Sequence, residues 1–110
     1  MREHRLLGIK IKPQSRKVAL EQIKKYIHHP LGYFHIVSLN PENVIVASEN
    51  EEFKKVIETS QIQLIDGVGI TLAAKLLGFK LERFTGVDLM LELIKLLVYV
   101  LIVLQIISKL

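Results

Sequence analysis

Residues 61–70 constrain the fold of this chain more than any other segment. An apolar, strand-like run ends there in Asp66, and Gly67 and Gly69 follow before a helical pattern begins. A strand that ends in this way places one carboxylate at the edge of a sheet, beside the N-terminus of a helix. Such edges are where open α/β sheets bind ligands. Because the chain has only one other aspartate, Asp88, we interpret Asp66 as a candidate functional residue.

The composition fits a single folded domain. The 110 residues are 50% hydrophobic and 24% charged, which excludes a disordered chain and allows a modest core. The absence of cysteine excludes a disulfide framework and suits a reducing cytoplasm, and we expect no signal peptide. The net charge of +4 comes from basic residues concentrated near the N-terminus. This surplus favours anionic lipid or phosphorylated substrates, or is simply a solvated face.

Alternating strand and helix patterns predict a Rossmann-like α/β fold, with a mostly parallel sheet and flanking helices. Strand patterns cover residues 6–11, 34–39 and 62–65. Helical patterns start after Ser15 and after Asn40, restart near residues 49–52, and cover residues 70–77 and 87–96.

The last residues form a separate apolar segment, 96–110. Residues 96–104 are all apolar, and Lys95 and Lys109 flank the run. We expect it to be too short for a membrane-spanning helix, which needs about 20 apolar residues. It fits a buried strand, a helix packed against a partner, or a segment that docks on a membrane. Its β-branched residues favour the buried strand.

Polar side chains lie at the ends of two predicted strands. Ser38 and Asn40 end the second strand, as Asp66 ends the third. The carboxyl ends of parallel strands lie on one edge, so we expect these side chains to converge on one crevice. There Asp66 can act as a general base or bind a sugar hydroxyl. The alternatives are that Asp66 caps the following helix and that Asn40 caps a helix beginning at Pro41.

Neighbouring residues suit a phosphorylated substrate. Gly67 and Gly69 permit close backbone approach, and the amides of a helix start can hold an anion. Arg83 can pair with the oxygens of a diphosphate leaving group, or form a surface ion pair with Glu82 or Asp88. The sequence has no Asp-x-Asp motif for a nucleotide-bound metal and no dinucleotide or Walker motif, so we expect no metal. Because aromatics are not interleaved with the basic residues, we expect no nucleic-acid partner.

Three motifs in this order resemble the WecG/TagA/CpsF family of glycosyltransferases. They are Ser38-Leu39-Asn40-Pro41-Glu42, Asp66-Gly67-Val68-Gly69, and Glu82-Arg83-Phe84-Thr85-Gly86-Val87-Asp88. Residues 6–95 are similar to the first half of such an enzyme. We therefore expect a glycosyltransferase-like domain over residues 1–95, apparently truncated, followed by the apolar segment 96–110.

The resemblance implies an activity and its site. In the TagA-like branch, N-acetylmannosamine passes from UDP-N-acetylmannosamine to undecaprenyl-diphosphate-linked N-acetylglucosamine, in wall teichoic acid biosynthesis. The transfer inverts the anomeric centre without metal or cofactor. By resemblance, Asp66 is the catalytic base, and the substrate-binding residues are Ser38, Asn40, Gly67, Gly69 and Arg83. The resemblance also implies a cytoplasmic protein, peripheral at the inner face of the cell membrane and able to self-associate.

Two other functions stay open. One is a non-catalytic α/β module that oligomerises or docks on a membrane through its apolar segment. The other is a different Rossmann-like domain that binds a nucleotide or nucleotide sugar, with Asp66 as a hydroxyl ligand. UDP binding without transfer favours the latter. Membrane binding or oligomers that vanish on deletion of residues 96–110, without UDP binding, favour the former.

Overall fold

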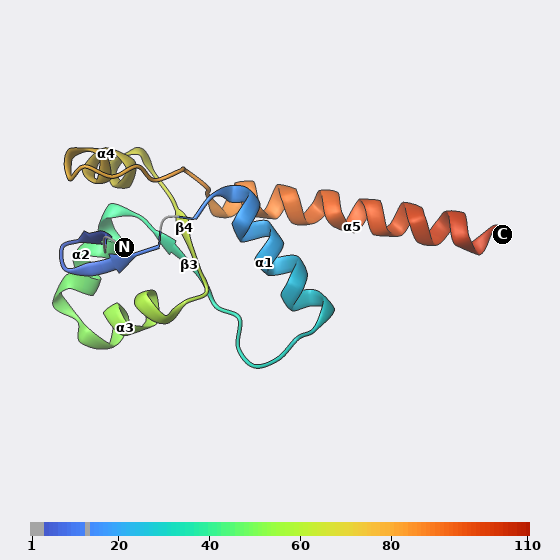
Figure 1. Cartoon of the computed structure of the whole chain (residues 1–110), viewed down its shortest axis with the longest axis horizontal. Helices are drawn as coiled ribbons and strands as arrows, with labels where there is room; N and C mark the ends of the chain where they lie inside the picture. Colours follow the sequence, from blue (N-terminus) through green and yellow to red (C-terminus); the bar gives the residue numbers. More distant parts are fainter. Residues whose placement is uncertain (1–3, 13) are drawn as a thin grey trace.

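A computed structural model shows an α/β body from which one long helix projects (Figure 1). The structure describes residues 4–12 and 14–110. The mixed α/β class confirms the prediction. In chain order the elements are β1 (His4–Leu6), β2 (Ile9–Ile11), α1 (Arg16–His28), β3 (Ile36–Leu39), α2 (Pro41–Glu49), α3 (Glu51–Thr59), β4 (Ile62–Ile65), α4 (Val68–Leu76) and α5 (Gly86–Ser108).

Strands β3 and β4 form a parallel two-stranded sheet in the body. Ile36 pairs with Ile62 at one end and Leu39 with Ile65 at the other. All four residues of β4 are buried, as expected for a parallel strand covered on both faces. The two strands run in the same direction, so both end at the same edge of the sheet. This confirms the parallel pairing predicted from their sequences.

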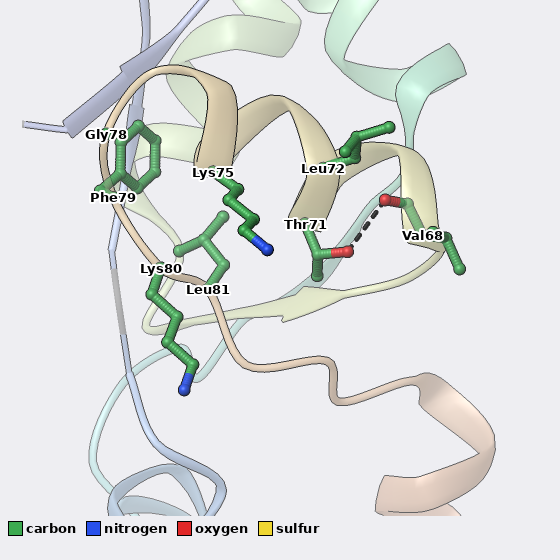
Figure 2. A pocket seen from close by; sticks show the side chains of 8 residues that line it. All are labelled: Val68, Thr71, Leu72, Lys75, Gly78, Phe79, Lys80 and Leu81. Carbon is green, nitrogen blue, oxygen red and sulfur yellow. Dashed lines mark hydrogen bonds between the residues drawn. The ribbon is translucent and has the colours of Figure 1, made fainter.

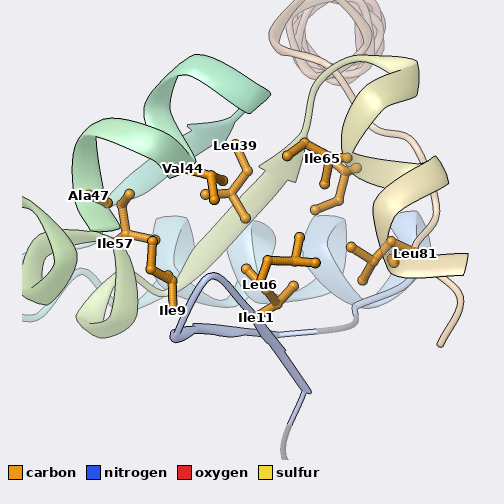
Figure 3. Close-up of a cluster of buried hydrophobic side chains, with 11 residues drawn as sticks. Leu6, Ile9, Ile11, Leu39, Val44, Ala47, Ile57, Ile65 and Leu81 are labelled. Atoms are coloured by element: carbon orange, nitrogen blue, oxygen red, sulfur yellow. The ribbon is translucent and has the colours of Figure 1, made fainter. Parts of the chain in front are cut away.

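The β3–β4 sheet separates two apolar clusters, because successive side chains of a strand point to opposite faces. On one face, Ile62 and Leu64 pack with Ala19 and Ile23 of α1 and with Leu89 of α5. The cluster on the other face joins the sheet to the β1–β2 hairpin and to α2, α3 and α4 (Figure 3). It consists of Leu6, Ile9, Ile11, Leu39, Val44, Ala47, Ile57, Ile65, Ile70, Ala74 and Leu81.

The first predicted strand is instead the antiparallel β1–β2 hairpin. Leu7 and Gly8 form its turn with φ of 50° and 81°, since a two-residue hairpin turn favours positive φ. The buried amide of Gln63 in β4 ties this hairpin to the sheet. Its Oε1 accepts from the Lys12 amide at 2.8 Å, and its Nε2 donates to the Lys10 carbonyl at 3.1 Å. A buried polar side chain is thereby satisfied.

Capping residues fix where the helices begin. The Ser15 hydroxyl accepts from the Val18 amide at 3.2 Å, as predicted for the start of α1. Asn50 ends α2 and caps α3 by accepting from the Phe53 amide at 3.0 Å, which explains the predicted break. After α4, Gly78 takes a φ of 91°, a conformation that favours glycine directly after a helix.

The prediction of a buried strand in residues 96–110 was wrong, because α5 continues to Ser108. Thr85 and Asp88 form a capping box at its start, and no Gly or Pro follows Gly86. Extending a helix adds one hydrogen bond per residue fixed, whereas a strand needs a neighbouring strand. Residues 96–110 are too short to span a membrane alone, as expected, but they are only the end of a longer helix. Counted from Gly86, the 23-residue helix is long and apolar enough to cross a membrane.

Candidate active site

The ends of β3 and β4 bring Asn40 and Asp66 to the same edge of the sheet. Leu39 and Ile65 are the last paired residues, so Asn40 and Asp66 follow at matching positions. The Asp66 amide donates to the Leu39 carbonyl at 2.8 Å, which holds the two chain segments together beyond the ladder. Asn40 and Asp66 therefore leave the sheet at neighbouring positions.

The glycines after Asp66 allow the N-termini of α2 and α4 to approach each other. A Cβ atom on Gly69 would lie 2.8 Å from Cγ of Pro41, closer than real Cβ atoms come. Gly67 has a φ of 102°, a conformation that side chains rarely adopt. Both glycines are thus required for the shape of this edge. Their predicted contact with substrate stays a prediction.

The carboxylate of Asp66 is half-buried and is not used as a helix cap. Residue Gly67 occupies the N-cap position of α4, and no side chain caps this helix. Within residues 4–12 and 14–110, the Asp66 side chain has no hydrogen-bond or ion-pair partner. The capping alternative therefore does not account for Asp66, and its oxygens are available to a ligand.

Asn40 is the N-cap of α2, so its capping alternative is correct. Its Oδ1 accepts from the Asn43 amide at 2.8 Å, and the Asn43 side chain donates to the Ser38 carbonyl at 3.0 Å. The cap occupies only the oxygen of the Asn40 amide, so its NH2 group can still donate to a ligand. Ser38 lies farther back, paired with Leu64 in the ladder and half-buried.

The loop before α5 carries Arg83 to the end of β4. The Phe84 amide donates to the Ile65 carbonyl at 3.0 Å, directly before Asp66. In the described part of the chain, the exposed Arg83 guanidinium forms no hydrogen bond or ion pair. Asp88, in the first turn of α5, pairs with another cation instead. The surface ion pair considered for Arg83 is therefore absent from the residues described.

That cation is Arg16, the first residue of α1 and one of the basic residues near the N-terminus for which a solvated face was one interpretation. Its Nη2 lies 3.4 Å from the Asp88 carboxylate and donates to the Arg83 carbonyl at 3.1 Å. Its guanidinium also lies 4.8 Å from the centre of the Phe84 ring. Arg16 thus fixes the loop that carries Arg83. Nothing near Arg16 in the sequence signals this role, because its partners lie near the other end of the domain.

The pKa of the Asp88 carboxyl lies below its usual range. The main cause is the Thr85 amide, which donates to Oδ2 at 3.0 Å, and the Thr85 hydroxyl adds to it. The positive charges of Arg16 and Arg83 contribute further. The loop that carries Arg83 is therefore anchored at the start of α5, through the capping box of Thr85 and Asp88 and the ion pair with Arg16.

A groove of about 700 Å³ runs along α4, starting beside this edge. It is bordered by α4 and the segment that follows it (Figure 2). The lining residues are Val68, Thr71, Leu72, Lys75, Gly78, Phe79, Lys80 and Leu81. Asp66 is not among them, but Val68 follows it closely in the chain. Sequence patterns did not predict this groove, because its two sides come from a helix and an irregular loop.

Among the described residues, no three His, Cys, Asp or Glu side chains gather closely enough to hold a metal ion. The expectation of metal-independent chemistry stays a prediction, since it concerns the reaction. What this edge does offer is an unpartnered carboxylate, an amide donor and two helix N-termini, and the loop that carries Arg83 is bonded to it through the Phe84 amide.

Comparisons with known proteins agree with the motifs. The sequence profile of the Glycosyl transferase WecG/TagA/CpsF family matches residues 4–99. A similar protein is the N-acetylglucosaminyldiphosphoundecaprenol N-acetyl-beta-D-mannosaminyltransferase of Bacillus spizizenii (strain ATCC 23059 / NRRL B-14472 / W23), 34% identical over 70 residues. The match covers 63% of this chain and 27% of that relative, so the chain corresponds to part of such an enzyme. The resemblance seen in the motifs is confirmed, and the chain belongs to the WecG/TagA/CpsF family of glycosyl transferases.

Proposed function

We propose that the chain carries the catalytic edge of an inverting, metal-independent N-acetylmannosaminyltransferase. The donor would be UDP-N-acetylmannosamine and the acceptor undecaprenyl-diphosphate-linked N-acetylglucosamine, as in the linkage unit of wall teichoic acid. The observation that carries the proposal is the unpartnered Asp66 carboxylate at the shared end of β3 and β4. The family match and the name of the similar Bacillus protein supply the substrate class.

In the proposed reaction, Asp66 takes the proton from a hydroxyl of the acceptor sugar. The oxygen attacks the anomeric carbon of the donor, and the bond from that carbon to the UDP oxygen breaks with its electron pair. Attack from the face opposite the leaving group inverts the anomeric centre. Arg83 offsets the charge that develops on the diphosphate. Asn40, Ser38 and the backbone at Gly67 and Gly69 hold the sugars.

The test is transfer from UDP-N-acetylmannosamine to a lipid-linked N-acetylglucosamine acceptor, with and without a chelator. We expect turnover that resists chelation and is lost in Asp66→Asn. Glu52→Gln is the matched control, because it exchanges an exposed carboxylate on α3 for an amide. The Asp66→Asn variant should change the free energy of unfolding by less than about 1 kcal/mol, as surface substitutions usually do. Equal turnover by Asp66→Asn and Glu52→Gln would refute the assignment of the base, and UDP binding without transfer would favour a nucleotide-binding domain.

We also propose that residues 1–95 act at the inner face of the cell membrane and that residues 96–110 contact lipid. From Leu97 to Ile107, the large apolar side chains other than Val103 are 43–67% exposed and lie on all sides of the projecting part of α5. A helix that is apolar on all sides is typical of burial in a core or a membrane. Lys24 lies beside Leu96, where α5 leaves the body, and suits anionic headgroups. Lys95 lies at the same place and pairs with Glu92 at 3.6 Å.

This membrane contact is also the basis of the second candidate function, a non-catalytic docking module. The test is co-flotation with phosphatidylglycerol vesicles, comparing the chain with Leu101→Glu/Leu104→Glu. Loss of vesicle binding in the variant, with no transfer by either protein, would favour docking alone. Self-association in place of vesicle binding, abolished by the same variant, would assign α5 to contacts between copies.

A further inference from the structure

We propose that the groove along α4 binds the diphosphate and the first isoprene units of the lipid-linked acceptor. This inference rests on the proposed function, because it names the place of one of its substrates. The groove is the space of about 700 Å³ between α4 and the segment 78–81 that returns beside it (Figure 2).

The groove has an apolar lining that is accessible from outside. Val68 and Leu72 on α4 are 68% and 54% exposed, and Phe79 and Leu81 border the groove from the returning segment. Exposed apolar side chains gathered around one depression are typical of a surface that binds an apolar ligand. An isoprene chain has the required chemistry, because it is branched, flexible and wholly apolar.

Two cations lie in the same groove. Lys75 comes from α4 and Lys80 from the returning segment. In Figure 2 the Lys75 side chain extends toward the returning segment, and Lys80 lies at the border of the groove on that segment. No acidic residue is among the lining residues. Within the part of the chain that the structure describes, neither ammonium group has a hydrogen-bond or ion-pair partner. A ligand that carries an anion next to an apolar chain complements the two lysines and the apolar lining. A neutral lipid would leave both ammonium groups unpaired.

The position of the groove relative to Asp66 suits an acceptor in which a diphosphate lies between the sugar and the isoprene chain. Val68 lies at the end of α4 nearest Asp66, and α4 rises about 10 Å from Val68 to Lys75. The acceptor carries its sugar, then its diphosphate, then its isoprene chain. With the sugar hydroxyl at Asp66, the diphosphate lies one sugar away, in the direction of the lysines.

The probe is farnesyl diphosphate, a short soluble polyprenyl diphosphate, titrated into the full chain by calorimetry. We expect it to bind at least about ten-fold tighter than inorganic diphosphate or farnesol, because only it uses both features. Lys75→Gln/Lys80→Gln should weaken this binding at least about ten-fold. Lys54→Gln/Lys55→Gln is the matched control, since it removes the same charge from α3, outside the groove. Unchanged binding in the groove variant would overturn the inference.

Further measurements separate this inference from the proposed function. If the chain transfers sugar, the groove variant should raise KM for the lipid acceptor and leave KM for the UDP-sugar unchanged. Transfer with an unaltered KM for the acceptor would refute the groove and leave the enzyme intact. Farnesyl diphosphate binding that needs Lys75 and Lys80, without transfer under any condition, would retain the groove and refute the enzyme. Phosphatidylglycerol vesicles should bind the groove variant as well as the parent chain, and a parallel loss would assign the lysines to membrane headgroups.

Discussion

Replacing Gly69 with alanine tests how tightly the two helix starts are packed at the proposed active site. The added Cβ would lie 2.8 Å from Cγ of Pro41, so α2 or α4 must move by several tenths of an ångström. Overpacking of this kind typically costs about 1–3 kcal/mol. Alanine regains at most about 1 kcal/mol through its higher helix propensity. We therefore expect Gly69→Ala to lower the free energy of unfolding by about 1–2 kcal/mol.

The assay is thermal unfolding followed by far-UV circular dichroism, in which a loss of this size lowers Tm by about 5–10 °C. The control is Gly86→Ala, because that glycine also lies in a first helical turn but has open space around its Cβ position. Pro41→Ala in the Gly69→Ala background should restore part of the loss, with a coupling of about 0.5–3 kcal/mol. If Gly69→Ala is as stable as Gly86→Ala, the packing of α2 against α4 is not as described.

Two further predictions concern the start of α5. Thr85→Ala removes the cap that accepts from the Asp88 amide at 3.1 Å, and should cost about 1 kcal/mol in urea unfolding. Thr59→Ala, an exposed threonine whose hydroxyl bonds only within the end of α3, should change stability by less than about 0.5 kcal/mol. Folding lowers the pKa of the Asp88 carboxyl, so its ionised form stabilises the fold. This contribution is fully present above the pKa of about 4 that the group has in the unfolded chain, and it is lost as the pH falls through the lower pKa of the folded chain. The stability difference between the parent chain and Asp88→Asn should therefore shrink from pH 6 to pH 2, and a constant difference would contradict this cause.

The parallel pair and its edge could be predicted because their signals are local. The change from a buried apolar run to Asp66 and glycines marks the end of β4, and Asn40 before Pro41 marks the start of α2. The direction of the strands followed from the helices between them. The sequence also left open whether Asp66 was a cap, and the structure answers this through the N-cap at Gly67.

Other features depend on contacts that no local pattern reveals. Arg16 looked like a solvated residue because its partners Arg83 and Asp88 lie far along the chain. The apolar segment was assigned to a strand because its β-branched residues have a high strand propensity. The strand propensity of these residues was overridden because the capped helix that begins at Gly86 continues through Lys95 into the segment without a break. The β1–β2 hairpin was not predicted because its turn consists of only two residues, Leu7 and Gly8.

Chemical rescue of Asp66→Ala tests the role of Asp66 as a base most directly. We expect this variant to transfer N-acetylmannosamine at least about 100-fold more slowly than the parent chain, since general-base catalysis contributes about 10²–10⁴-fold. Added formate should restore part of the rate in the variant and have no effect on the parent chain, because it supplies the missing carboxylate. Transfer by Asp66→Ala within about ten-fold of the parent rate, without formate, would show that Asp66 is not the base.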